Sequence, residues 1–99
     1  MIDLSDQQRA IVAGILAEYL PPGTPVWVFG SRATGKARRY SDLDLALEGE
    51  AEMSIDVLGA LKDALSESDL PFTVDLVDLR VADPVFRARI APEMMAFPA

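Results

Sequence analysis

The chain has 99 residues, of which 51% are hydrophobic and 25% are charged, and this balance predicts a single folded domain over residues 1–99 rather than a disordered segment. It contains no cysteine and no histidine, which excludes disulfides, thiolate metal sites and an imidazole base, so any acid–base or metal chemistry must use Asp and Glu. The net charge of −7 argues against direct nucleic-acid binding by the whole surface, and no apolar run reaches the ~20 residues of a membrane span, so we expect a cytoplasmic protein.

The first predicted element is an amphipathic helix over residues 5–20. Ser5 and Gln8 form a capping-box pattern, and apolar residues then recur at every third or fourth position. The sequence Pro21-Pro22-Gly23 ends this helix and turns the chain toward an apolar, β-prone run over residues 26–29.

A glycine-started basic loop follows this first strand. Gly30 lets the backbone approach a ligand, and Ser31 can open a short helix whose free N–H groups attract an anion. Four of the nine basic residues fall within the next eight positions, namely Arg32, Lys36, Arg38 and Arg39. Beside such a turn, this positive loop favours contact with an anion or a partner, and we expect Arg32 or Lys36 to add charge around bound phosphates.

The second and third predicted strands carry three aspartates. The second strand is predicted over residues 43–48. Alternation from Asp42, just before it, to Asp44 places the two carboxylates on one face, about 7 Å apart. In the strand over residues 72–79, Asp75 can point to the same face if the two strands are neighbours. Asp78 is a second choice for the third acid, because it lies an odd step of three positions from Asp75 and therefore faces the opposite way in a regular strand.

Two further helices complete the prediction. Ser54 caps a helix that runs to Ser66 and carries its acids on a solvated face. Asp83-Pro84 begins a short helix whose inward residues are expected to be Val85, Phe86 and Ile90. The resulting order predicts an α/β (α+β) fold, a small mixed sheet of about three strands with helices on one face and the three aspartates on the other.

Carboxylates arranged in this way suit Mg²⁺, which prefers oxygen ligands and often binds a few carboxylates together with substrate phosphates. Two ions about 4 Å apart can be bridged by Asp42 and Asp44, so that one activates a hydroxyl and the other neutralises a triphosphate. Asp75 would complete the first ion and accept the hydroxyl proton, while Gly30 and Ser31 would hold the terminal phosphates.

A competing motif overlaps the same loop, because Gly30-x4-Gly35-Lys36 imitates the start of a P-loop. Ala37 stands where a Ser or Thr should coordinate Mg²⁺, and the residues after it do not form an apolar helix. We therefore set the P-loop interpretation aside.

The pattern Gly30-Ser31-x10-Asp42-x-Asp44, followed by Asp75 in VDLVDL, resembles the polymerase-β-type nucleotidyltransferases and in particular the minimal nucleotidyltransferase (MNT) proteins. The similarity extends over nearly the whole chain. It implies a nucleotidyltransferase-like fold and Mg²⁺-dependent transfer of AMP from ATP to a tyrosine of a helical HEPN toxin, with the MNT protein as the antitoxin of a hetero-oligomeric pair. It also implies that Asp42 and Asp44 bind metal, that Asp75 is the third ligand and base, and that Gly30 and Ser31 grip the triphosphate.

Two alternatives remain open at the level of sequence. The chain could be a non-catalytic antitoxin that neutralises its partner by association alone, or it could transfer a nucleotide to a small molecule or an RNA end. A lone domain with an open sheet face offers little pocket for an acceptor, which favours a second protein as the acceptor. The apolar residues Met94, Met95 and Phe97 could dock that partner or could pack in the core.

Overall fold

The computed structural model describes residues 1–98 and confirms a mixed α/β fold. The helical elements are α1 (Asp6–Tyr19), α2 (Ser31–Thr34), α3 (Ile55–Ser66), α4 (Pro84–Ile90) and the short 3₁₀ turn η1 (Ala91–Glu93). The strands are β1 (Val26–Phe29), β2 (Leu43–Leu47), β3 (Val74–Asp78) and β4 (Met95–Phe97). None of the helices in this part of the chain combines the length and apolar character that a membrane crossing requires.

The predicted caps begin the helices. At α1, the Ser5 side chain accepts a hydrogen bond from the Gln8 amide, and the Gln8 side chain accepts one from the Ser5 amide, which completes the capping box. Ser54 caps α3 through the amide of Val57. These local bonds satisfy amides that have no partner within the helix, so the sequence alone determines where the helices begin.

Helix α4 begins as predicted but presents one residue differently. Asp83 accepts a hydrogen bond from the Val85 amide, and Pro84 occupies the first turn. The expectation that Val85 points inward is wrong, because its side chain is 79% exposed. Phe86 and Ile90 are four residues apart and share one face of the helix, whereas Val85 lies about 140° around the helix from Ile90.

The sheet has the strand order β3-β2-β1-β4. β1 pairs antiparallel with both β2 and β4, whereas β2 and β3 are parallel and are connected by the α3 crossover. As a consequence, the C-terminal end of β1 lies at the same end of the sheet as the N-terminal ends of β2 and β3. The glycine turn and all three predicted aspartates occur at that end of the sheet.

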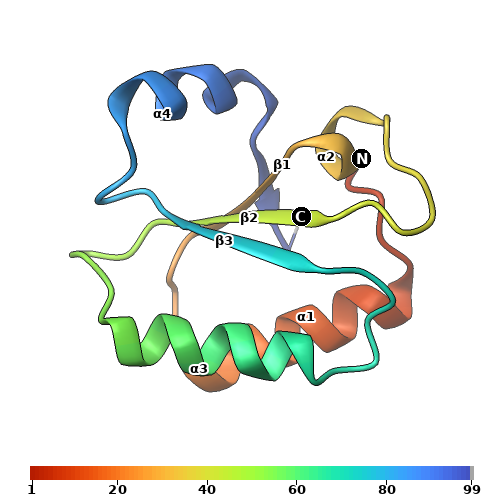
Figure 1. Ribbon diagram of the computed structural model, residues 1–99, viewed down its shortest axis with the longest axis horizontal. Coiled ribbons are helices and arrows are strands. Elements are labelled where there is room, and N and C mark those ends of the chain that lie inside the picture. The colour runs from red at the N-terminus through yellow and green to blue at the C-terminus, as the bar shows by residue number, and fades with distance from the viewer. Residues whose placement is uncertain (99) are drawn as a thin grey trace.

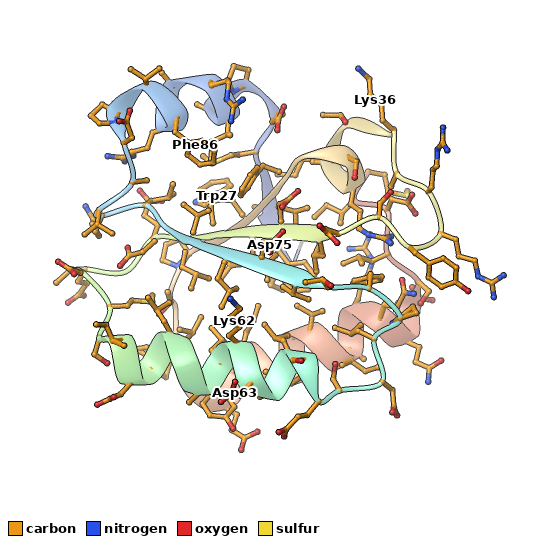
Figure 2. All side chains as sticks on the ribbon, in the orientation of Figure 1. Trp27, Lys36, Lys62, Asp63, Asp75 and Phe86 are labelled. Carbon is orange, nitrogen blue, oxygen red and sulfur yellow. The ribbon has the colours of Figure 1, made fainter. Side chains whose placement is uncertain are left out.

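One face of the sheet is covered by α1 and α3, which lie side by side below it in Figure 1. This layer contains the larger hydrophobic core, in which the alternate strand residues pack against the helices. Its fully buried members include Val12, Val28, Leu43, Leu45, Leu47 and Leu61. The exposed acids of α3 form its solvated face as predicted, and Asp63 points away from the sheet in Figure 2.

The other face is partly covered by α4, which lies above the sheet in Figure 1. A smaller core joins Phe29, Ala46, Leu79 and Ile90, with Trp27 and Phe86 packed against it. The Phe29 and Phe86 rings meet edge to face at a centroid distance of 5.9 Å. Helices therefore occupy both faces, in contrast to the expected one, and the second face is open toward its aspartate-bearing end.

The last strand, β4, was not predicted. It places Met95 opposite Val28 and Phe97 opposite Val26 at the edge of the sheet. The proposal that Phe97 docks a partner is wrong, because this side chain is 5% exposed within the larger core. Met94 and Met95 are also partly buried against the two cores.

Candidate active site

The turn after β1 brings the backbone into contact with an aspartate. Gly30 has φ 76° and ψ −156°, a conformation available essentially to glycine alone, and it precedes the first residue of α2, Ser31. A Cβ atom on Gly30 would overlap the carboxylate of Asp44. The glycine is therefore required both by its backbone angles and by the proximity of this side chain.

The strand register brings together the aspartates that the sequence singled out. Asp44 lies opposite Phe29 on one side and opposite Asp75 on the other. Asp42 precedes β2 by one residue and shares the alternation of Asp44. Asp42 and Asp75 are exposed and Asp44 is half-buried, so all three can be reached from solvent.

The sequence did not indicate a fourth acid at this end of the sheet. Glu93, in η1, accepts a hydrogen bond from the Gly30 amide through Oε1 at 2.8 Å. The two residues are 63 positions apart, and no motif links them. Only the β4 pairing could have indicated the contact, because extending its register by two residues places Glu93 opposite Gly30. We call Asp42, Asp44, Asp75 and Glu93 the acid cluster.

The electrostatics of the acid cluster are unfavourable in the absence of a cation. Burial raises the pKa of Asp44 above its usual value, and repulsion from Asp75, Asp42 and Glu93 raises it further. Like charges that are brought together in this way favour the binding of a cation.

The acid cluster is not a preformed metal cage. Among residues 1–98, no three acidic side chains are close enough together to hold a metal ion by themselves. The three predicted aspartates therefore lie at the same end of one face of the sheet, but they do not form a complete set of metal ligands. Such an arrangement still suits Mg²⁺, which is commonly held by one or two carboxylates together with substrate phosphates and water.

Asp78, the second choice for the third acid, has a structural role. Its side chain faces the layer of α1 and α3 and is 7% exposed. The carboxylate accepts hydrogen bonds from the amides of Met53 at 2.8 Å and Arg80 at 2.9 Å. These bonds fix the loops that follow β2 and β3, on the side of the sheet opposite to the acid cluster.

The structure contradicts the expectation that Arg32 contacts phosphates. Its side chain is 4% exposed, and its guanidinium donates hydrogen bonds to the carbonyl oxygens of Asp3, Arg39 and Ser41 at 2.9, 3.2 and 3.0 Å. It also lies 4.0 Å from the centre of the Phe72 ring. We call these five residues the Arg32 cluster, which joins the N-terminal segment to the loop that leads into β2.

The remaining predicted phosphate-binding residues lie at the surface. Ser31 is partly exposed at the first position of α2, next to Gly30. Lys36 is exposed in the loop after α2, and Figure 2 shows its side chain extending away from Asp75. Apart from Arg32, the positive charges of this loop are at its outer surface, which suits contact with an incoming anion or partner.

A cavity of about 960 Å³ lies elsewhere, between the loops that follow α1 and β2. Four glutamates and one arginine are the charged residues of its lining: Glu18, Glu48, Glu50, Glu52 and Arg80. The cavity lining lacks the Gly-Ser turn that lies beside the acid cluster. The acid cluster is therefore the better candidate for nucleotide chemistry.

Comparisons with known proteins give matches to a protein family and to single relatives. Residues 15–94 match the family model described as "Polymerase beta, Nucleotidyltransferase". The chain is 46% identical over 86 residues to the Haemophilus influenzae protein named "Probable protein adenylyltransferase MntA", covering 87% of this chain and 75% of that protein.

Solved structures show the same fold. A toxin–antitoxin with AMP-PNP is 27% identical, with a TM-score of 0.75, and the match covers 89% of this chain and 70% of that chain. A complex of tri-AMPylated Shewanella oneidensis HEPN toxin with MNT antitoxin matches at 22% identity and a TM-score of 0.67, covering 89% of this chain and 66% of that chain. The second likeness concerns the fold alone.

Proposed function

The chain belongs to the polymerase beta nucleotidyltransferase family, and from this premise we propose that it is an antitoxin enzyme that transfers AMP from ATP to a helical HEPN toxin. The observation that carries the proposal is the position of Asp44. Its carboxylate lies against Gly30 on one side and opposite Asp75 on the other, so the phosphate-type turn and the acids form one site.

The relatives support the choice of nucleotide and partner. The Haemophilus influenzae relative is named as a protein adenylyltransferase, and the solved toxin–antitoxin relative contains AMP-PNP. The structure of similar fold with an MNT antitoxin contains a HEPN toxin that carries AMP groups. Together these favour ATP as the substrate and a toxin as the acceptor, and the family resemblance suggests a tyrosine hydroxyl as the accepting group.

The residues at the site fit Mg²⁺. Asp42 and Asp75 are exposed and Asp44 is half-buried, and the pKa of Asp44 is raised first by burial and then by repulsion from the neighbouring acids. Oxygen ligands of this kind suit a hard divalent cation. Held by one or two of these carboxylates together with substrate phosphates and water, Mg²⁺ would neutralise the triphosphate and increase the reactivity of the acceptor hydroxyl.

The transfer exchanges one phosphorus–oxygen bond for another. The acceptor oxygen forms a bond to the α-phosphorus of ATP, the bond from that phosphorus to pyrophosphate breaks, and the hydroxyl proton passes to Asp75. Gly30 and Ser31 hold the terminal phosphates through backbone N–H groups and the serine hydroxyl. Asp44 lies between the Gly30 turn and Asp75, which places the triphosphate site beside the proposed base.

The experiment is a transfer assay with α-labelled ATP, Mg²⁺ and the proposed HEPN toxin partner as acceptor. Wild type should label the toxin, and Asp44→Asn should reduce labelling by about 100-fold or more, because one metal-binding carboxylate is lost. The matched control is Asp63→Asn, which removes an exposed acid of α3 on the far side of the molecule.

A different result would support neutralisation by binding. If wild type does not label the toxin, and Asp44→Asn still protects cells against it, the chain is a non-catalytic antitoxin and the proposal fails. Circular dichroism and thermal unfolding of the variant show whether its fold is intact.

A further inference from the structure

Glu93 binds the backbone group that a phosphate would be expected to use. The Gly30 amide lies at the start of α2 in the phosphate-type turn, and the Glu93 carboxylate accepts its hydrogen bond at 2.8 Å. A carboxylate and a phosphate are both anionic oxygen acceptors, so they compete for the same N–H group.

The fold holds Glu93 at this position. β4 pairs Met95 with Val28, and η1 ends at Glu93, two residues before this pair, so Glu93 lies within reach of the Gly30 amide. β4 is only three residues long and lies at the edge of the sheet. Side-chain rotation of Glu93, or a small displacement of η1, would release the amide without disturbing the core below the sheet.

Glu93 also adds negative charge beside Asp44, where a triphosphate would add more. Retaining all of these charges around Gly30 would be electrostatically costly. The bond between Glu93 and Gly30 is therefore compatible with the nucleotide-free protein and is poorly compatible with a bound triphosphate.

On the basis of the proposed function, we propose that Glu93 is an internal competitor of the triphosphate that occupies the Gly30 amide and sets the affinity for nucleotide. ATP displaces the carboxylate when it binds. Glu93 therefore differs in role from Asp42, Asp44 and Asp75, which act with the substrate in place.

The test is a titration of wild type and Glu93 variants with AMP-PNP and Mg²⁺ by isothermal calorimetry. Glu93→Ala and Glu93→Asp should each bind AMP-PNP about tenfold more tightly, because neither side chain reaches the Gly30 amide. Glu93→Gln keeps an oxygen that can accept the bond but loses the charge, so its affinity should be intermediate. Glu67→Gln, an exposed residue at the end of α3, controls for the loss of one negative charge.

Two outcomes would overturn the inference. If Glu93 only holds the glycine turn in place, Glu93→Ala and Glu93→Asp should bind AMP-PNP more weakly and Glu93→Gln should resemble wild type. If only net charge matters, Glu93→Asp should resemble wild type and Glu93→Gln should match Glu93→Ala.

The titration also separates this inference from the function on which it depends. Failure of wild type itself to bind AMP-PNP would contradict the proposed function. Binding by wild type that is unchanged in all three Glu93 variants would contradict the competitor role alone. The amide resonance of Gly30, followed by NMR during the titration, should shift in wild type as Glu93 is replaced by phosphate.

Discussion

The Arg32 cluster and the acid cluster lie on either side of the same glycine turn and use charge in opposite ways. Around Arg32, guanidinium nitrogens donate to the carbonyl oxygens of Asp3, Arg39 and Ser41, and the charge is buried. In the acid cluster, by contrast, burial raises the pKa of Asp44 and the adjacent like charges raise it further.

This difference separates a structural site from a functional one. A buried charge whose nitrogens each donate a hydrogen bond to the backbone holds the fold together and is not free to bind a ligand. Clustered like charges reduce stability unless a ligand compensates them, so their presence at an open edge indicates binding or catalysis. The two clusters should therefore respond oppositely to substitution, the first in stability and the second in function.

The largest effect on stability is expected at Arg32. Replacement by leucine leaves the carbonyl groups of Asp3, Arg39 and Ser41 without their donor in a partly buried position, so we expect the free energy of unfolding to fall by about 3 to 5 kcal/mol. Arg32→Lys should lose less, because an ammonium group can satisfy part of the network. Urea unfolding followed by circular dichroism measures both, and an unchanged midpoint for Arg32→Leu would contradict the structural role.

A smaller loss is expected at Gly30, where the two clusters meet. Gly30→Ala adds a Cβ against the Asp44 carboxylate in a backbone conformation that alanine rarely adopts, which should cost about 2 to 3 kcal/mol and abolish transfer. Gly35→Ala is the matched control, because Gly35 has φ 79° with open space around it and should cost only about 1 kcal/mol.

Equal losses of stability in the two glycine variants would show that Asp44 does not press against Gly30. Normal transfer by Gly30→Ala would show that this contact is not needed for activity. The transfer assay and thermal unfolding therefore test the contact separately.

The smallest effect is the pH dependence that Asp44 produces without divalent ions. Because its pKa is higher in the folded than in the unfolded chain, the folded state loses stability as pH rises through the interval between these two values. Asp44→Asn should therefore be more stable than wild type near pH 7, by less than about 1 kcal/mol after solvent screening, and this advantage should shrink toward pH 4.

Urea unfolding in EDTA at several pH values measures the difference in free energy of unfolding between wild type and Asp44→Asn. Asp63→Asn should show no such trend, since Asp63 is exposed on α3 and remote from the acid cluster. A difference that grows as pH falls would contradict the raised pKa.

Local sequence patterns were sufficient to predict much of the fold. The caps at Ser5, Ser54 and Asp83 depend on bonds between residues two or three positions apart, so these helix starts were predicted correctly. Alternation likewise assigned Asp44 and Asp75 to one face and Asp78 to the other, because the period of a strand is fixed by its backbone.

Features that depend on distant contacts could not be predicted. Arg32 looked like a phosphate ligand because it follows a glycine turn, but the carbonyl groups that bind it come from separate segments. Likewise, β4 is too short to have a periodic pattern, so neither the strand nor the position of Glu93 was visible. Both differences arise from tertiary contacts that no local spacing encodes.

The most direct test of the proposed site is a crystal structure of the protein with AMP-PNP and Mn²⁺, in which anomalous scattering locates the metal. We expect metal within about 2.5 Å of carboxylate oxygens of Asp42 and Asp44, with the triphosphate on the Gly30 turn. Metal and nucleotide bound away from these residues, for example in the glutamate-lined cavity between the loops after α1 and β2, would contradict the assignment of the acid cluster as the active site.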